Sequence, residues 1–464
     1  MKKLTKRKML RYCLSDIAKG LFNGMIGNYL LYFFQPTVKS GIPNLLPQNK
    51  LLGFITVMAL LTGIGKVIDA VTDPWVANMS DKCTHKEGRR IPFLKYAAIP
   101  YAVSVLMIFY APFKEGSVLN AIWVGVFLVA YYTAYTFFFI PRNALVPEII
   151  PDAKDRVEYY GISTAFFMGS SSFMYAATLF VDIIKKNFNV SALWSWRIVF
   201  TVFAAIGLTC VLLGATAIKE KEYVQESKQP KESLVGSALS IFKNKSFLVF
   251  FGGDLFSYIS MAFFQTAMLY YITMLLNVPE NQSFLVMISA IGVALCLFPL
   301  IIKFSKKYGK KAMLVAASVV FTIVFAFIFF ADKLSALVAG YELALGLFMG
   351  IVVAFPFAAI NILPQSCMSD IIQKDSVENG VNREGFFSAT KTFIEKIAYS
   401  VAMVVVSSVL AIGAPAGESV GMLGVKLTGV FAGLFSLVSL LFFMLYDEKS
   451  VTEFIEKHKE KSGK

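Results

Sequence analysis

Two stretches of about twenty residues contain no charged side chain, and they limit what the chain can fold into. Ala121–Ile140 and Leu427–Tyr446 are predominantly apolar and long enough to cross a bilayer as helices. Hydrophobic residues make up 57% of the chain and charged residues only 16%, whereas a soluble domain carries about 25% charged residues. So little charge cannot cover the surfaces of two or three soluble domains. We therefore predict a polytopic membrane protein and exclude a soluble enzyme and a disordered protein.

Hydropathy along the whole chain predicts twelve membrane spans. They cover residues 14–34, 51–79, 91–112, 118–140, 159–184, 198–218, 246–276, 284–302, 312–331, 336–365, 386–412 and 422–446. With the N-terminus inside, most of the 44 Lys and Arg residues fall in segments on the cytoplasmic side. Because basic residues gather on that side, we predict a protein of the cell membrane with both termini in the cytoplasm. The net charge of +14 is thus a sign of topology rather than of nucleic-acid binding.

Short motifs recur after nearly half of the chain, which indicates an internal duplication. The pairs are Gly88-Arg89-Arg90 with Gly309-Lys310-Lys311, Ile140-Pro141 with Leu363-Pro364, and Glu148-Ile149-Ile150 with Asp370-Ile371-Ile372. We predict an all-α protein with an N-terminal six-helix half (1–218), a cytoplasmic linker (219–245), a C-terminal six-helix half (246–446) and a cytoplasmic tail (447–464). Two such pseudo-symmetric halves are typical of the major facilitator fold, which transports solutes by alternating access.

The chain lacks the residue clusters that membrane-embedded catalysis would need. Only two histidines, His85 and His458, are present, and the five cysteines are scattered without a CxxC pair. We therefore expect neither an enzyme nor a cofactor, and no metal beyond a transported cation. No phosphate-binding P-loop is visible, so transport should run on an ion gradient. A scaffold or receptor-like membrane protein is the alternative, and the duplication disfavours it.

The second predicted span contains three charged residues, each of which needs a reason to lie in a membrane. An ionisable side chain inside a span costs about 2.5–3.5 kcal/mol on insertion scales. Asp69 and Asp73 lie one helical turn apart on one face, and Lys66 lies one turn before Asp69. Two stacked carboxylates offer hard oxygen ligands to a small cation, or a proton relay. We predict that Asp69 and Asp73 bind the driving cation beside Lys66, with a structural ion pair as the alternative.

The eleventh predicted span carries a polar stripe. Ser388, Thr392 and Lys396 recur every four residues, so they share one helix face that is expected to line a cavity. We predict that Lys396 is a counter-charge which the cation displaces from the acidic pair of the second span, giving a route to coupling. A permanent structural pair is the alternative. Glu395 lies off the stripe and is predicted to pair with Lys391.

Further polar or aromatic residues in other spans are candidates to line the same cavity. They are Asp254 in the seventh span, Tyr29 and Tyr32 in the first, and Tyr135 in the fourth. The tyrosines would stack on a sugar ring or line an apolar pocket. Pairing of Asp254 with a base from a loop is the alternative role for that residue. At the start of the first span, Asp16 and Lys19 are predicted to pair with each other.

The short segment between the second and third spans is strongly charged. Asp81, Arg89 and Arg90 are predicted to form salt bridges that close the cytoplasmic side in the outward-facing state. Arg383, which precedes the eleventh span, is assigned the same gating role. The alternative is that these charged residues only set the topology of the chain in the membrane. The two roles are compatible.

The motifs of the second and eleventh spans together resemble the glycoside–pentoside–hexuronide:cation symporters, the melibiose permease family. The matching segments are Asp69-Ala70-Val71-Thr72-Asp73-Pro74, Asp81 with Gly88-Arg89-Arg90, and Asn382-Arg383-Glu384-Gly385 followed by Lys396. The resemblance implies the major facilitator fold and coupling to sodium, lithium or protons. It also implies that Asp69 and Asp73 are the cation residues, with Lys396 nearby.

The resemblance implies a function, with one alternative on the same fold. We expect a symporter that carries a sugar or glycoside together with a monovalent cation across the cell membrane. Gly20, Phe139 and Thr164 stand where the melibiose transporters carry carboxylates or a base that grip the sugar. Transport of a lipid or another amphiphilic solute is therefore the alternative.

Overall fold

Twelve helical segments follow one another along the part of the chain that the computed structural model describes, residues 4–48, 50–51, 55–150, 153–223, 244–379, 384–415 and 418–461. Each of the twelve predicted spans has a helical counterpart among the described residues. The helices group into two compact units. The first comprises Met1–Gln229, Glu280–Phe284 and Met403–Gly421, and the second comprises Pro230–Pro279, Leu285–Ala402 and Met422–Lys464.

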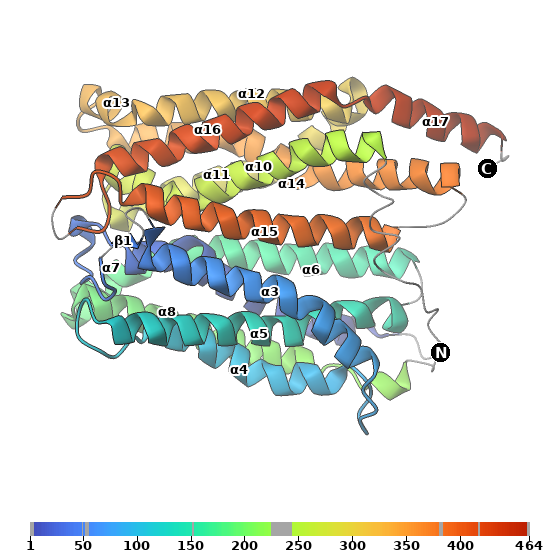
Figure 1. Ribbon diagram of the computed structural model, residues 1–464, viewed down its shortest axis with the longest axis horizontal. Helices are drawn as coiled ribbons and strands as arrows, with labels where there is room; N and C mark the ends of the chain where they lie inside the picture. The colour runs from blue at the N-terminus through green and yellow to red at the C-terminus, as the bar shows by residue number, and fades with distance from the viewer. Residues whose placement is uncertain are drawn as a thin grey trace. The chain divides into compact units, whose positions relative to one another are not determined.

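The first unit is built from six of the twelve helical segments, joined by short turns and a two-residue β-ladder. Its elements are α1 (Lys6–Gly24), η1 (Met25–Tyr29), α2 (Leu30–Phe34), η2 (Val38–Ser40), β1 (Lys50–Leu51), β2 (Ile55–Thr56), α3 (Val57–Asp81), α4 (Ile91–Phe109), α5 (Val118–Ile149), α6 (Ala153–Phe173), η3 (Met174–Ala176), α7 (Ala177–Phe188), α8 (Ala192–Ala215) and η4 (Glu220–Glu222). In this unit α5 packs against α3 and α4, and α1 against α6 and α8 (Figure 1).

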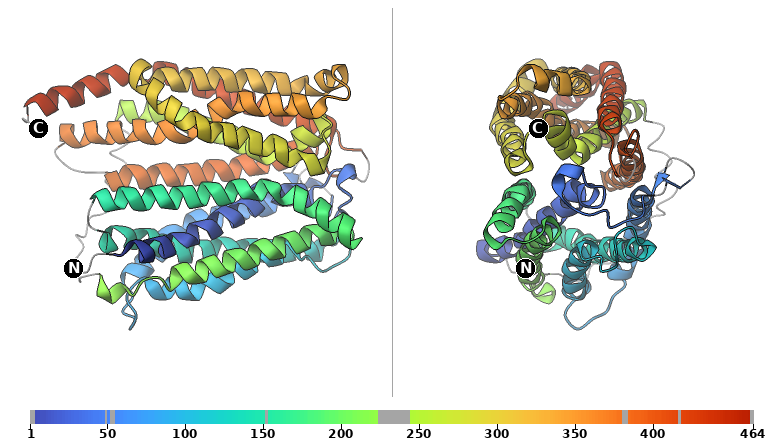
Figure 2. Two further views of the ribbon diagram at one scale, coloured as in Figure 1. Left: turned by 180° about the vertical axis from the view of Figure 1, so that it is seen from behind. Right: turned by 90° about the vertical axis from the view of Figure 1, so that its left-hand side faces the viewer.

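The second unit contains the other six segments and a C-terminal helix. The elements from the linker onward are α10 (Lys245–Tyr270), η5 (Tyr271–Leu275), α11 (Glu280–Tyr308), α12 (Lys310–Phe329), α13 (Ala331–Leu337), α14 (Glu342–Asn379), α15 (Glu384–Leu410), α16 (Met422–Leu445) and α17 (Glu448–Lys461). Here α16 packs against α10 and α12, and α14 packs against α12 and α17. The views in Figure 2 show the helices of each unit running lengthwise and, end-on, gathered into a cluster.

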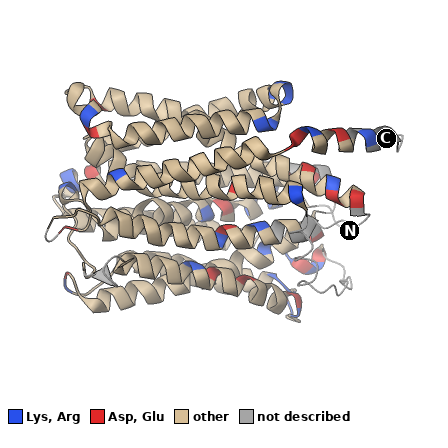
Figure 3. Ribbon diagram, turned by 45° about the horizontal axis from the view of Figure 1, so that its top comes forward, with Lys and Arg blue, Asp and Glu red and all other residues tan. Residues whose placement is uncertain are grey.

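Ten helices of the described residues are long and apolar enough to cross a membrane. The remaining two segments, α1 and α3, carry several charges in their helical stretch, and those charges lower their hydropathy. Figure 3 shows Lys, Arg, Asp and Glu gathered mostly near helix ends in both units, with a few in the middle. The chain is therefore a multi-pass helical membrane protein whose few internal charges stand out.

Small residues let the helices of the first unit approach closely. A Cβ atom added to Gly20 on α1 would lie 2.5 Å from the carbonyl oxygen of Phe167 on α6. A Cβ atom on Gly207 of α8 would lie 2.3 Å from the ring of Phe22 on α1. Lipid is as apolar as a leucine side chain, so close van der Waals packing of this kind is what holds membrane helices together.

Several predicted boundaries differ from the structure. The fourth and tenth spans were expected to end at 140 and 365, but α5 continues to Ile149 and α14 to Asn379. A helix can continue beyond the apolar core of the bilayer, where apolar sequence no longer marks it. Arg142, counted as a loop residue in the charge distribution, therefore lies inside α5. The tenth span begins at Glu342 rather than 336, since Gly340 with φ +89° breaks the helix there.

The predicted linker and tail are partly visible. Residues 224–243 of the linker lie outside the described residues, and its beginning forms the short helix η4. The predicted tail forms α17, whose Val451 and Ile455 are buried. The boundaries of the two predicted halves therefore stay predictions.

Candidate functional site

The acidic pair of the second span shares one hydroxyl group from a neighbouring helix. Asp69 and Asp73 lie on α3, and Asp69 is only 2% exposed. The Thr136 hydroxyl on α5 lies 3.2 Å from Asp69 Oδ1 and 3.1 Å from Asp73 Oδ1. The Thr72 hydroxyl lies 3.4 Å from that of Thr136. A hydroxyl has one proton to donate, so Thr136 can satisfy one carboxylate at a time while its oxygen stays available to a cation.

Thr136 is a site residue that the sequence argument did not identify. Its only signal was its place in the fourth span, next to the candidate Tyr135, and periodicity alone does not show which helix faces α3. Tyr135 is partly buried, with its ring 5.9 Å from that of Tyr101 and 4.9 Å from that of Phe139. The predicted counter-charge Lys66 lies on α3, with its ammonium 4.5 Å from the centre of the Tyr132 ring on α5.

A second buried charge cluster lies in the same unit, between α1, α5 and α6. Arg142, 2% exposed, donates two hydrogen bonds to Asp16, at 3.1 and 2.6 Å. The Ser163 hydroxyl donates to the same carboxylate at 2.6 Å. The rings of Tyr12 and Phe139 lie 4.9 and 5.7 Å from the guanidinium carbon. The predicted partner of Asp16 was Lys19, and that prediction is wrong, because Arg142 inside α5 reaches Asp16 instead.

The predicted pairing of Glu395 with Lys391 is confirmed in the second unit. Glu395 Oε1 lies 3.1 Å from Lys391 Nζ on α15, and the same ammonium contacts Asp254 Oδ2 on α10. Asp254 is 4% exposed, so it does not line an open cavity, and its basic partner comes from a span rather than from a loop. Lys396 and Thr392 lie on the same helix, α15, where Lys396 is partly buried and Thr392 exposed.

Two of the predicted cavity tyrosines lie in the packed interior of the first unit. Tyr29 has no exposed surface, and its hydroxyl donates to the backbone oxygens of Met174 and Tyr175 at 3.1 and 3.3 Å. Tyr32 is 1% exposed, and both tyrosine rings pack near Trp196. The expectation that they line a cavity is therefore wrong in this structure. Aromatic rings in a span serve packing as readily as binding, and sequence alone does not separate the two.

The predicted gating residues form a network at the predicted cytoplasmic end of the first unit. Arg90 contacts Asp81 at 2.8 Å and Glu148 at 2.7 Å, and Arg89 contacts Glu148 at 3.2 Å. Glu220 of η4 accepts hydrogen bonds from the backbone N–H groups of Arg89, Arg90 and the residue that follows, at 2.8 to 3.0 Å. Glu220 thus caps the N-terminus of α4, where the helix dipole favours a carboxylate.

The same arrangement recurs in the second unit, as the internal duplication predicts. Lys310 pairs with Asp370 on α14 at 2.6 Å. Glu448 accepts hydrogen bonds from the N–H groups of Lys310 and Lys311 at 2.8 and 2.9 Å, and so caps α12. Gly88 and Gly309 precede the two capped helices with φ +126° and +91°, a backbone that favours glycine. Arg383, the other predicted gating residue, lies outside the described residues.

The exposed segment between α3 and α4 adds one weaker contact to the first network. Lys95 on α4 donates a hydrogen bond to Glu87 at 2.6 Å. This bond holds the pKa of Glu87 below its ordinary value. Its small contribution to stability is present above the ordinary pKa of a glutamate and is lost as the pH falls through the lowered value. Because the contact is exposed, it restrains this segment locally and contributes little to the stability of the fold.

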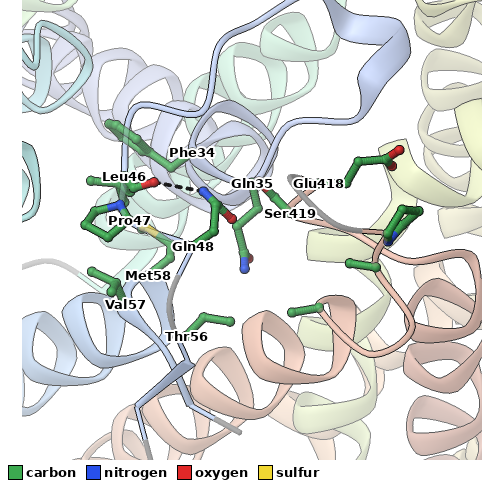
Figure 4. A pocket seen from close by; sticks show the side chains of 13 residues that line it. Phe34, Gln35, Leu46, Pro47, Gln48, Thr56, Val57, Met58, Glu418 and Ser419 are labelled. Carbon is green, nitrogen blue, oxygen red and sulfur yellow. Dashed lines mark hydrogen bonds between the residues drawn. The ribbon is translucent and has the colours of Figure 1, made fainter. Parts of the chain in front are cut away.

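At the predicted outer end of the first unit lies a pocket of about 200 Å³ with polar and apolar walls. Figure 4 shows the amides of Gln35 and Gln48 on one side of it and Glu418 and Ser419 on the other. Beside it, Ser407 donates to Gln35 Oε1 at 2.9 Å and shares a hydrogen bond of 2.7 Å with a threonine of β2. Such groups suit a solute rich in hydroxyls.

Comparisons with known proteins agree with this architecture. The family model described as MFS/sugar transport protein matches residues 11–447. The putative glycoside/cation symporter YagG of Escherichia coli is 24% identical over 463 residues, which cover 95% of this chain and 92% of that protein. The lactose permease of Lactobacillus helveticus is 21% identical over 408 residues, 86% of this chain and 61% of that protein.

A solved structure with the same fold comes from a transporter of another solute. The crystal structure of the nucleoside transporter NupG matches with a TM-score of 0.64 and 15% sequence identity. The match covers 96% of this chain and 100% of that chain. At this level of identity the likeness concerns the fold alone, and it confirms the major facilitator fold. The alternative of an amphiphile transporter is not favoured by the relatives, whose names refer to glycosides and lactose.

Proposed function

Because the chain belongs to the MFS/sugar transport family, we propose that it is a symporter which carries a sugar or glycoside together with a monovalent cation. The members of this family and the proteins that share the fold are transporters rather than enzymes. The observation that carries the proposal is the acidic pair on α3, which shares the hydroxyl of Thr136. Two carboxylates and one hydroxyl form an oxygen-rich group inside a membrane span, where an excess of negative charge must be matched.

The driving cation binds at Asp69 and Asp73. Hard cations prefer carboxylate, hydroxyl and carbonyl oxygens, and α3 and α5 supply the first two kinds. When the cation enters, it takes the place of the Thr136 proton on one carboxylate, and Thr136 turns its oxygen toward the cation. Sodium fits this set well, and a proton or lithium ion would use the same carboxylates. The side chain of Lys66, held over the Tyr132 ring, tempers the negative charge when the site is empty.

The substrate is coupled to the cation through the charge balance of the cavity. Lys396 on α15 is a counter-charge that is released when a cation neutralises the acidic pair, which lowers the cost of the change between outward-facing and inward-facing states. Two side chains contact the sugar hydroxyls. They are Thr392, which lies one helical turn before Lys396, and Tyr135, which directly precedes Thr136. The cytoplasmic networks around Arg90 and Lys310 hold the inner helix ends in a fixed arrangement during this change.

The proposed location and topology rest on the charge distribution. The basic segments, including the networks around Arg89 and Lys310, face the cytoplasm by the positive-inside rule. The pocket lined by Gln35 and Glu418 then faces outward, where a solute would arrive. We therefore place the protein in the cell membrane with both termini in the cytoplasm.

The test is uptake by proteoliposomes that contain the purified protein. A panel of labelled glycosides, lactose among them, is offered with and without an inward sodium gradient, and then with a proton gradient. The proposal predicts concentrative uptake of at least one glycoside that depends on one of the two gradients. A lysolipid added to the same panel is the matched comparison for the amphiphile alternative. Accumulation of the lysolipid alone, or glycoside entry that ignores both gradients, would contradict the proposal.

A further inference from the structure

Three ionisable side chains meet inside the second unit, within two helices long enough to span the membrane. Asp254 lies on α10, and Lys391 and Glu395 lie on α15. The Lys391 ammonium contacts Asp254 Oδ2 and lies 3.1 Å from Glu395 Oε1. The side chains of Asp254, Lys391 and Glu395 are 6%, 13% and 17% exposed. Two carboxylates thus share one ammonium group in a largely buried position.

The trio carries a net charge of −1 when all three groups are ionised. An unmatched buried charge raises the free energy in a medium of low dielectric constant. The change that costs least free energy is the binding of a proton that neutralises this charge. One turn after Asp254 on α10 and one turn after Glu395 on α15, the rings of Tyr258 and Tyr399 lie 6.1 Å apart, and Cys367 of α14 is close enough to Asp254 to interact with it electrostatically. None of these three side chains supplies a positive charge at neutral pH.

The other charged groups on the neighbouring helices pair with different residues or point in a different direction from the trio. On α14, Asp370 pairs with Lys310, and Asp375 accepts a hydrogen bond from Asn244. On α16, Lys426 pairs with Asp332. Lys396 follows Glu395 directly on α15, so it points about 100° away around the helix. Among the described residues, no second base contacts Asp254 or Glu395.

The geometry favours a proton over a metal cation as the balancing charge. The ammonium group already touches both carboxylates, so an added metal cation would be repelled at close range. Hard cations also need several oxygen ligands that are free to turn toward them, and here the Lys391 ammonium already contacts both carboxylates. A proton needs no such shell. A protonated carboxyl also keeps an oxygen that can accept a hydrogen bond from Lys391.

We propose that Glu395 is a proton-binding site, distinct from the cation site at Asp69 and Asp73. Of the two carboxylates, Asp254 is the more buried, and its direct contact with Lys391 matches one negative charge with one positive charge. Glu395 is the more exposed, so of the two carboxylates it is the one better placed to exchange a proton. With Glu395 protonated, the trio is neutral. The protein thus carries a second ionic site in its second unit, which gives transport a dependence on pH beyond that of the driving cation.

The experiment measures protonated carboxyl groups directly, by infrared difference spectroscopy of the purified full-length protein between alkaline and neutral pH. The proposal predicts a protonated-carboxyl band at neutral pH that is lost in Glu395→Gln. Glu453→Gln, which changes an exposed residue of α17, is the matched control and should keep the band. Because no substrate is needed, the result stands even if no glycoside is transported. An unchanged band in Glu395→Gln, or no band in the natural protein, would overturn the proposal.

Two further variants give the trio a signature that a plain structural ion pair lacks. Asp254→Asn leaves Glu395 as the sole partner of Lys391, so the neutral-pH band should disappear although Glu395 is present. Lys391→Met removes the base, so the band should grow as both carboxylates take up protons. A band that stays constant in both variants contradicts the proposal. If Glu395→Gln does not elute as a folded protein in size-exclusion chromatography, the loss of the band in Asp254→Asn tests the proposal in its place.

Discussion

The buried pair of Asp16 and Arg142 should be one of the strongest determinants of stability in the first unit. Asp16→Asn keeps the size of the side chain but removes its charge. The Arg142 guanidinium, 2% exposed, is then left without a matching anion. The carbonyl oxygen of asparagine can accept at most two of the three hydrogen bonds that the aspartate accepts, two from Arg142 and one from Ser163, and the amide NH2 group accepts none.

The size of the effect follows from these contacts. Breaking a buried ion pair by removing one partner costs about 3–5 kcal/mol, because the other charge stays buried and unmatched. The rings of Tyr12 and Phe139 offset part of this loss, since each cation–π contact contributes about 0.5–2 kcal/mol. We therefore expect Asp16→Asn to lower the free energy of unfolding by about 3 kcal/mol, at the lower end of the range.

The assay is reversible unfolding in mixed micelles, followed by tryptophan fluorescence, for three variants. Asp16→Asn should show the loss, and the double variant Asp16→Asn with Arg142→Met should recover at least half of it, because no unmatched charge remains. Glu87→Gln removes an exposed ion pair and should leave the free energy of unfolding unchanged within error. A loss below about 1 kcal/mol for Asp16→Asn, or a double variant at least as unstable as Asp16→Asn alone, would refute the reasoning.

Three other changes test separate parts of the structure. Gly88→Ala should destabilise the protein by at least about 1 kcal/mol, because φ is +126° and the new Cβ would lie 2.7 Å from Glu220 Cβ; thermal unfolding of the purified protein measures this. Glu448→Ala should cost about 0.5–2 kcal/mol in the same assay by uncapping α12, and Glu448→Gln should cost less, while an equal cost would contradict the cap. Ser407→Ala should cost about 1–3 kcal/mol by removing the hydroxyl that donates to Gln35, and a neutral result would show that this hydrogen bond is dispensable.

The sequence was enough to predict the twelve helices because long apolar stretches have few structural solutions in a bilayer. It also predicted the duplication, since glycine and charged motifs mark the inner helix ends in both halves. Helix ends that extend beyond the apolar stretches were predicted less well. Arg142 fell outside the predicted fourth span, because the apolar stretch was taken to end at residue 140, yet α5 continues past it.

The partners of the charged residues were harder to predict. A pair within one helix, such as Lys391 with Glu395, follows from the spacing of four residues. A pair between helices, such as Asp16 with Arg142, depends on which faces meet, and one sequence carries no such information. Thr136 escaped notice for the same reason, since a threonine in an apolar span has no distinguishing neighbour in the sequence. Buried tyrosines such as Tyr29 resemble binding residues until their hydrogen-bond partners are known.

The most direct test of cation coupling is the ion dependence of glycoside uptake by Asp69→Asn and Asp73→Asn in proteoliposomes at fixed membrane potential. Both variants keep the size of the side chain and remove one cation ligand each. Concentrative uptake, and its stimulation by the driving cation, should be abolished in either variant, while exchange of substrate without a gradient survives. Thr136→Val should weaken the dependence on cation concentration without abolishing it. Normal expression with unchanged cation dependence in both aspartate variants would contradict the account.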